Sequence, residues 1–166
     1  MKPWIAALMV ALAGPAIAQH PQPYADLQHR TVKALSDQQM SDLRTGRGMG
    51  LALSAELNGY PGPLHVIELA DRLQLTSDQR AQVQWLYDAM KAEAISVGEK
   101  LITQEAALDR LFAERIVSTR SLARLTAQIG ETQGQLRTVH LKYHLTTAEL
   151  LTADQRQRYA ELRGYR

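Results

Sequence analysis

Two histidines four residues apart, His140 and His144, are the side chains in this sequence best placed to do chemistry together. On a helix, that spacing puts both imidazoles on one face, within reach of a single metal ion. A second pair, His65 and Glu68, has an i, i+3 spacing that also shares a helix face. Together the four side chains could bind zinc, copper, nickel or cobalt. The same spacings occur on ordinary helix surfaces and in packed interfaces, and the sequence leaves this alternative open.

The residue patterns of common enzyme active sites do not occur here. No serine, histidine and acid surround a strand-to-helix turn, and no glycine-rich phosphate loop follows a strand. The glycine-rich stretch 46–50 has no predicted strand before it, so we interpret it as the flexible start of a helix. The absence of cysteine removes thiolate ligands and cysteine nucleophiles. The sequence predicts a protein that is not an enzyme, with a divalent transition metal as its one candidate cofactor.

The first 18 residues have the pattern of a cleaved signal peptide. Lys2 supplies a positive charge, residues 5–12 form a short apolar run, and Ala16-Ile17-Ala18 is a typical cleavage site. A membrane anchor is the alternative, but the apolar run is short for a membrane span and no lipobox cysteine follows. We expect export by the general secretion route, with cleavage after Ala18.

Composition after cleavage indicates one small, nearly neutral domain. Removal of residues 1–18 leaves 148 of the 166 residues, and the loss of Lys2 leaves 18 basic residues against 17 acidic ones. This balance gives no reason to expect nucleic acid as a partner. Residues 19–34 begin with a Gln, Pro and His-rich stretch that predicts a flexible segment. Residues 35–166 are predicted to form a single helical domain.

Apolar spacing of three and four residues predicts an all-α fold. The expected helices cover residues 36–46, 49–57, 64–73, 77–114, 118–150 and 152–162. The short link 115–117 joins the two long helices into an αα-hairpin flanked by short helices. Such an elongated hairpin leaves much of its apolar stripe uncovered, so a second subunit is expected to cover part of it.

Three glycines interrupt the long helices. Gly98 predicts a bend in the first one. Gly130 and Gly134 lie off the apolar stripe of the second, where each costs about 1 kcal/mol relative to alanine. Either a close contact with another chain or tolerated sequence drift explains this pair.

The five-residue pattern Leu-Thr-x-Asp-Gln occurs twice, at residues 75–79 and 151–155, each time before a predicted helix. A looser copy occupies residues 35–39. In the two strict copies the threonine is expected to cap the helix and the glutamine to reach back to the backbone amide of the threonine, which is a capping box. An aspartate in the first turn suits the helix dipole. The fixed positions are Leu75, Thr76 and Gln79 in the first copy and Leu151, Thr152 and Gln155 in the second.

These two L-T-x-D-Q copies, together with the leader and the helical pattern, resemble the periplasmic Spy/CpxP family, which is named for its LTxxQ motifs. The resemblance covers about residues 64–165. It implies a curved, cradle-like, all-helical homodimer in the periplasm, acting as an ATP-independent chaperone for unfolded proteins or in the envelope-stress response. A membrane-anchored signalling protein is the alternative partner. Heavy-metal-resistance relatives imply the alternative function, a metal sensor that uses His140, His144, His65 and Glu68.

Overall fold

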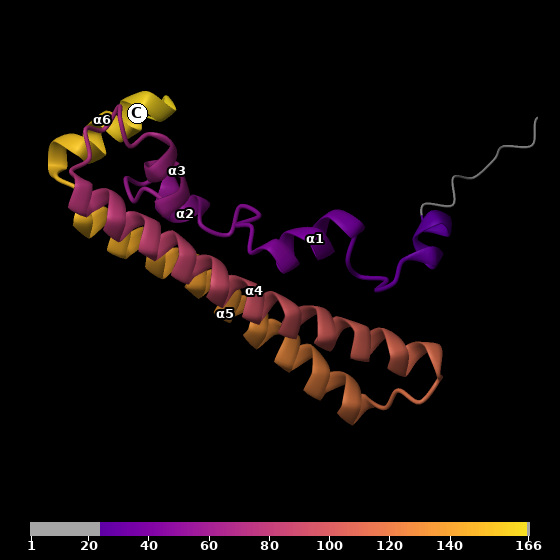
Figure 1. Cartoon of the computed structure of the whole chain (residues 1–166). Helices are drawn as coiled ribbons and strands as arrows, with labels where there is room; N and C mark the ends of the chain where they lie inside the picture. Colours follow the sequence, from indigo (N-terminus) through magenta and orange to yellow (C-terminus); the bar gives the residue numbers. More distant parts are fainter. Residues whose placement is uncertain (1–23, 166) are drawn as a thin grey trace, which may run out of the picture.

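The computed structural model describes residues 24–165, and all regular structure in this range is helical (Figure 1). The elements in order are η1 (Ala25–His29), α1 (Asp37–Thr45), α2 (Leu53–Glu56), α3 (Pro63–Glu68), α4 (Ser77–Ala113), α5 (Thr119–Leu150) and α6 (Ala153–Arg163). The predicted all-α fold with a long αα-hairpin and short flanking helices is confirmed. The predicted signal peptide, residues 1–18, lies outside the described residues.

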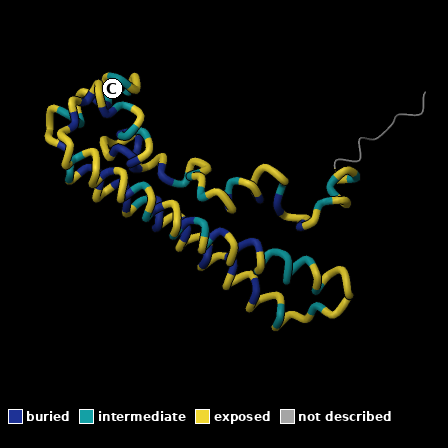
Figure 2. Tube along the Cα trace, viewed as in Figure 1, coloured by how far each residue is buried: buried dark blue, intermediate teal, exposed yellow. Residues whose placement is uncertain are grey.

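The two long helices α4 and α5 lie side by side over most of their length (Figure 1). The chain reverses direction at Arg115, which has a left-handed φ of 57°. Helix α5 then begins with a capping box between Ser118 and Ser121. The predicted stripe is buried in the middle of the hairpin, at residues such as Leu86, Leu101 and Leu136, and its burial decreases toward the turn (Figure 2).

Helix α1 packs directly on α4, and a glycine makes this packing possible. A β-carbon at Gly98 would lie 2.6 Å from the carbonyl oxygen of Leu43, near the end of α1. The sequence predicted a bend at Gly98, but its evident role is this close approach of the α1 backbone, because any larger residue would push α1 away. A β-carbon at Gly130 or Gly134 would meet no neighbouring atom within 4 Å, and both positions lie on the open face of α5.

Apolar side chains form two buried clusters. The larger one lies between α1 and the hairpin and includes Met40, Leu43, Met90 and Leu136. The smaller one lies where α3 and α6 meet the base of the hairpin, with these buried members: Val66, Ala70, Leu73, Leu75, Val83, Leu151 and Tyr159. The short helices α2 and α3 are therefore held against the hairpin near the start of α4 and the end of α5.

Two predicted helices are shorter than expected. The helix predicted over residues 49–57 is only α2, because Met49 and Gly50 have left-handed backbones with φ of 45° and 76°. The helix predicted over residues 64–73 ends at Glu68, and the chain continues in turns to Gln74, whose φ is 52°. A short helix in an apolar stretch depends on tertiary contacts, so its ends are poorly determined by local spacing.

The segment 19–34, which was predicted to be flexible, is described from residue 24 onward. It contains η1, and Val32 is 3% exposed in the larger apolar cluster. Within residues 24–165, no helix combines the length and the apolar character required to cross a membrane.

Candidate functional site

A cleft of about 1010 Å³ lies between α1 and the helices α2 and α3, and it is lined by Tyr87, Met90 and Lys91 in the first half of α4. The loop 46–50, which joins α1 to the turn before α2, forms one side of it. All four candidate metal ligands line this cleft: His65, Glu68, His140 and His144. Residues that the sequence places in two distant pairs are therefore brought to one cavity by the packing of α3 against the hairpin.

His140 lies deep in the cleft wall. Its side chain is 2% exposed, and its Nε2 atom has no hydrogen-bond partner among the described residues. Gly48 lies close to the ring, since an added β-carbon there would be 3.9 Å from Cε1 and from Nδ1. Burial, helped by the nearby His144, lowers the pKa of His140 and keeps the imidazole neutral. His144 is also buried, at 8% exposed, although the spacing of the two histidines alone does not predict burial.

His144 is fixed by the turn that precedes α3. Its Nδ1 lies 2.7 Å from the carbonyl oxygen of Tyr60, and because a carbonyl can only accept, Nδ1 carries the hydrogen. Gly62 lies against the ring, since a β-carbon there would be 2.8 Å from Nε2. The Pro-Gly-Pro turn at residues 61–63 thus packs directly on this histidine, which leaves its ring little freedom to turn.

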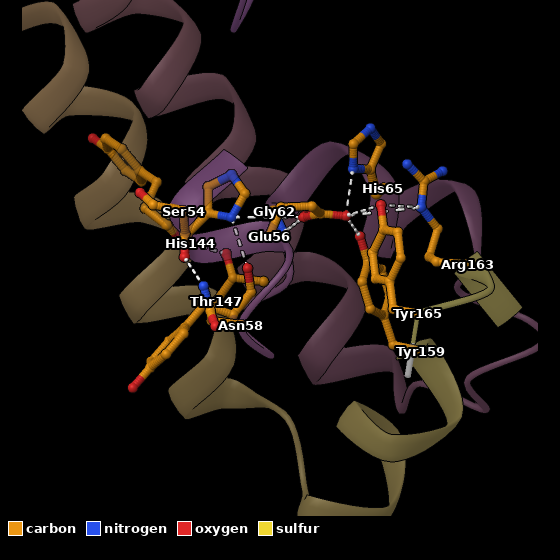
Figure 3. Close-up of polar contacts among 12 residues, drawn as sticks. Ser54, Glu56, Asn58, Gly62, His65, His144, Thr147, Tyr159, Arg163 and Tyr165 are labelled. Carbon is orange, nitrogen blue, oxygen red and sulfur yellow. Dashed lines mark hydrogen bonds and ion pairs between the residues drawn. The ribbon is translucent and has the colours of Figure 1, made fainter. Parts of the chain in front are cut away.

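The carboxylate of Glu56, at the end of α2, is the polar centre of this region (Figure 3). Its Oε2 accepts from the Gly62 amide at 3.2 Å and lies 3.7 Å from His144 Nδ1. Its Oε1 lies 3.3 Å from His65 Nδ1. The candidate ligands His65 and His144 therefore flank one buried glutamate, from α3 and α5 respectively.

The C-terminal helix α6 contacts the same carboxylate (Figure 3). Tyr159 donates its hydroxyl to Glu56 Oε1, and the Tyr165 hydroxyl donates to the same oxygen at 3.1 Å. The Arg163 Nε atom lies 3.8 Å from it. Burial opposes ionisation, but hydrogen bonds from His65, Tyr159 and the Gly62 amide, with the charge of His65, lower the pKa of Glu56 to about 2. Glu56 therefore links α2, α3, α5 and α6 as a carboxylate.

The six fixed motif positions come together at the base of the hairpin. Leu75 and Leu151 are 6% and 3% exposed in the smaller apolar cluster. Both threonines accept from the glutamine amide three residues later, so both predicted capping boxes are present, and the looser copy at Ser36 forms one too. The glutamines also contact each other, since Gln79 Nε2 donates to Gln155 Oε1 at 2.9 Å and Gln155 Nε2 donates back at 3.0 Å.

A comparison with protein families matches the part of the sequence that carries both motifs. A family model described as LTXXQ motif family protein matches residues 64–163, more than half of the chain. The chain belongs to the LTXXQ motif family. This confirms the resemblance to Spy/CpxP-type proteins that the motif spacing indicated. No curated protein and no solved structure matches the chain significantly.

The family match covers only part of the cleft of this LTXXQ protein. The four candidate ligands and both motifs lie within residues 64–163, whereas Glu56 and the loop 46–50 precede them. Sequence reasoning did not single out Glu56, Tyr159, Arg163 or Tyr165. The one available signal was an acid at position 56 in an otherwise apolar stretch, because such an acid needs partners when it is buried.

As placed, the candidate ligands do not close a metal site. Among residues 24–165, no group of three or more His, Cys, Asp or Glu side chains is arranged to hold a metal ion. His65 Nδ1 is directed to Glu56 and His144 Nδ1 to a backbone carbonyl. Of the described histidines, only His140 presents a buried ring nitrogen without a partner.

The mouth of the cleft carries exposed apolar side chains. Met49, Leu53 and Leu64 line the cleft and are 41%, 55% and 40% exposed. Polar groups of α1 and the basic side chains of Arg47 and Lys91 complete the lining. Such a cavity offers apolar contact area together with hydrogen-bonding groups, which suits an extended polypeptide segment better than a small, fully enclosed ligand.

Proposed function

We propose that this LTXXQ protein is a periplasmic, ATP-independent chaperone that binds apolar segments of unfolded proteins in its cleft. The observation that carries the proposal is the open cleft with Met49, Leu53 and Leu64 exposed at its mouth. Apolar side chains that gather at a concave surface are a common feature of protein-binding sites. The lack of a nucleotide-binding motif in the sequence supports a mechanism without ATP.

The chemistry of the cleft fits weak binding of many sequences. The exposed Met49 is flexible and polarisable, so it can adapt to side chains of different shape. Polar groups from Gln38, Ser41 and Thr45 can hydrogen-bond to the backbone of an extended segment. Burial of a few apolar side chains, each contributing about 1.5–3 kcal/mol before ordering costs, gives reversible rather than permanent capture.

The test is light scattering from an aggregating client protein with and without the mature chain, in the absence of nucleotide. The double variant Leu53→Ser/Leu64→Ser should suppress aggregation much less than the wild type. Leu145→Ser is the matched control, because Leu145 is 50% exposed but does not line the cleft. Equal suppression by both variants, with equal melting temperatures, would show that the cleft is not the client site.

Metal binding is the second candidate function, and a specific observation favours it: His65, Glu68, His140 and His144 all line one cleft. Closure of a site would require at least three of these side chains to come closer together than they lie in this structure. Titration with zinc, copper, nickel or cobalt should show weaker binding in His140→Ala and His144→Ala, and binding should weaken as acid protonates the imidazoles. His29→Ala is the control, since His29 is exposed on η1. Equal affinities in all variants would exclude this site.

Export and dimer formation belong to the same proposal. Mass spectrometry of the periplasmic fraction should find a chain that begins at Gln19. Sedimentation velocity of that chain should give the mass of two copies. An uncleaved leader or a monomer at micromolar concentration would contradict these two parts without affecting the cleft experiment.

A further inference from the structure

The turn between α4 and α5, here called the hairpin tip and defined as residues 110–124, exposes large apolar side chains. Phe112 is 54% exposed, Ile116 is 60% exposed and Leu122 is 36% exposed. Figure 1 shows the tip at the opposite end of the hairpin from α6 and the C-terminus. In Figure 2 the tip is coloured as exposed or intermediate over nearly its whole length. These side chains contribute little to the core, so stability does not explain them.

The tip is also strongly basic. Its 15 residues contain four arginines and one acid, Glu114, in a chain whose total charge is close to zero. The arginines are all exposed: Arg110, Arg115, Arg120 and Arg124. No salt bridge among the described residues involves any of them, whereas Lys142, elsewhere on the hairpin, pairs with Glu93 at 2.6 Å. The positive charge of the tip is therefore free to meet an external anion.

We propose that the hairpin tip docks on an anionic phospholipid surface. Phe112 and Ile116 would enter the boundary between headgroups and acyl chains, while the arginines bind lipid phosphates. Arginine suits this role because its planar guanidinium forms two parallel hydrogen bonds to a phosphate. The tip is a narrow, projecting end with few apolar side chains. A lipid surface can deform around such an end and needs no pocket of complementary shape. Its charge is complementary to the anionic headgroups.

The expected attachment is weak and reversible. Each arginine near an anionic surface strengthens binding about fivefold, and the gain disappears as salt screens it. If only the tip contacts the membrane, the rest of the hairpin extends away from the membrane surface. The cleft residue Lys91 precedes the end of α4 by 22 residues, which corresponds to about 33 Å along a helix. The cleft would therefore stay open to solvent, and the inference does not depend on what the cleft binds.

Co-sedimentation of the mature chain with vesicles tests the proposal. Vesicles of phosphatidylethanolamine and phosphatidylglycerol at 3:1 should bind the wild type, and vesicles of phosphatidylcholine alone should bind it at least tenfold more weakly. Arg115→Gln/Arg120→Gln should weaken binding to anionic vesicles about 25-fold if the two effects multiply. Phe112→Ser/Ile116→Ser should weaken it at least tenfold. Matched controls are Arg158→Gln on α6 and Leu145→Ser on α5, both exposed positions outside the tip, and neither should change binding.

A fluorescence experiment reports the contact directly. The described chain contains one tryptophan, Trp85, which is 67% exposed and far along α4 from the tip. In a Trp85→Phe background, Phe112→Trp should shift its emission to shorter wavelength when anionic vesicles are added. Binding that is equal for both vesicle types, unchanged in the tip variants, or without an emission shift would overturn the proposal. It would also be overturned if the tip variants abolished a dimer and no vesicle bound, because the tip would then be a subunit interface.

Discussion

The side-chain amides of Gln79 and Gln155 are hydrogen-bonded to each other in both directions, at 2.9 Å and 3.0 Å, across 76 residues of sequence. Each Oε1 atom also accepts from the amide of its own threonine, Thr76 or Thr152. The second hydrogen of Gln79 Nε2 goes to the carbonyl of Leu150 at 2.9 Å. The two motifs are thus halves of one structure, which ties the start of α4 to the start of α6.

This relationship predicts that the two glutamines are energetically coupled. Gln79→Ala and Gln155→Ala should each destabilise the fold by about 2–3 kcal/mol, because each removes the acceptor for the backbone N–H of its threonine and leaves the partly buried groups that the glutamine contacts unsatisfied. The double variant should cost less than the sum, with a coupling of roughly 0.5–3 kcal/mol. Urea unfolding of the four proteins measures this coupling. Strict additivity would mean that the mutual hydrogen bonds contribute nothing.

The looser motif copy supplies a matched control. Gln39 forms a capping box with Ser36, but its exposed side chain has no long-range hydrogen bond among the described contacts. Gln39→Ala should therefore cost only about 0.5–1 kcal/mol, because the Ser36 cap is kept and only the exposed Ser36 N–H loses its acceptor, and it should show no coupling to Gln155→Ala.

The threonine positions are predicted to be structural only. Thr76→Ala and Thr152→Ala should each lower stability by about 1 kcal/mol, because each removes the acceptor for one amide at a helix start. Serine at either position should restore most of the loss. Thermal melts give the comparison, and a loss of the proposed aggregation suppression without a change in melting temperature would show that the threonine contacts a ligand.

Substitution of the helix glycines by alanine should change stability in opposite directions, downward at Gly98 and upward at Gly130 and Gly134. A β-carbon at Gly98 would meet the Leu43 carbonyl oxygen at 2.6 Å, so Gly98→Ala should displace α1 and destabilise the fold. Gly130→Ala and Gly134→Ala meet nothing within 4 Å and should each stabilise by about 0.5–1 kcal/mol. The melting temperatures of the three variants, compared with that of the wild type, test both expectations. Destabilisation at Gly130 at dimer-forming concentration would instead indicate a close contact with a second chain.

Local chemistry determined which parts of the fold could be predicted. The long helices were predicted to within about one residue, since Thr76 and Ser118 cap their starts and the apolar spacing continues for many turns. The short helices were predicted too long, because the left-handed residues Met49 and Gln74 carry no reliable sequence signal.

The candidate site could be predicted only in part. Spacing identified the pairs His140/His144 and His65/Glu68, and the structure places all four in one cleft. The burial of His140 was not predictable, since it depends on coverage by a loop from another part of the chain. The role of Glu56 was not predicted for the same reason. Its partners come from three other helices, so no spacing within one helix indicates that they meet.

The last prediction concerns acid and the buried carboxylate of Glu56. Its pKa is about 2 in the folded protein, against an ordinary value of 4.5, so the folded state binds fewer protons than the unfolded state between these values. The resulting stabilisation, about 3 kcal/mol, is complete above about pH 5 and is lost as the pH falls from 4.5 toward 2. Glu93, whose pKa is lowered mainly by its hydrogen bond from Lys142, adds to the decline of the whole protein.

The difference between two proteins therefore isolates Glu56. Glu56→Gln keeps the shape of the side chain but removes the charge that His65, Tyr159 and Arg163 face. It should be less stable than the wild type at pH 7, and the two stabilities should converge as the pH approaches 2. Glu149→Gln changes an exposed position of α5, and its free energy of unfolding should follow that of the wild type at every pH. Urea unfolding at several pH values measures all three, and a constant gap between wild type and Glu56→Gln would show that Glu56 contributes through shape and hydrogen bonding rather than charge.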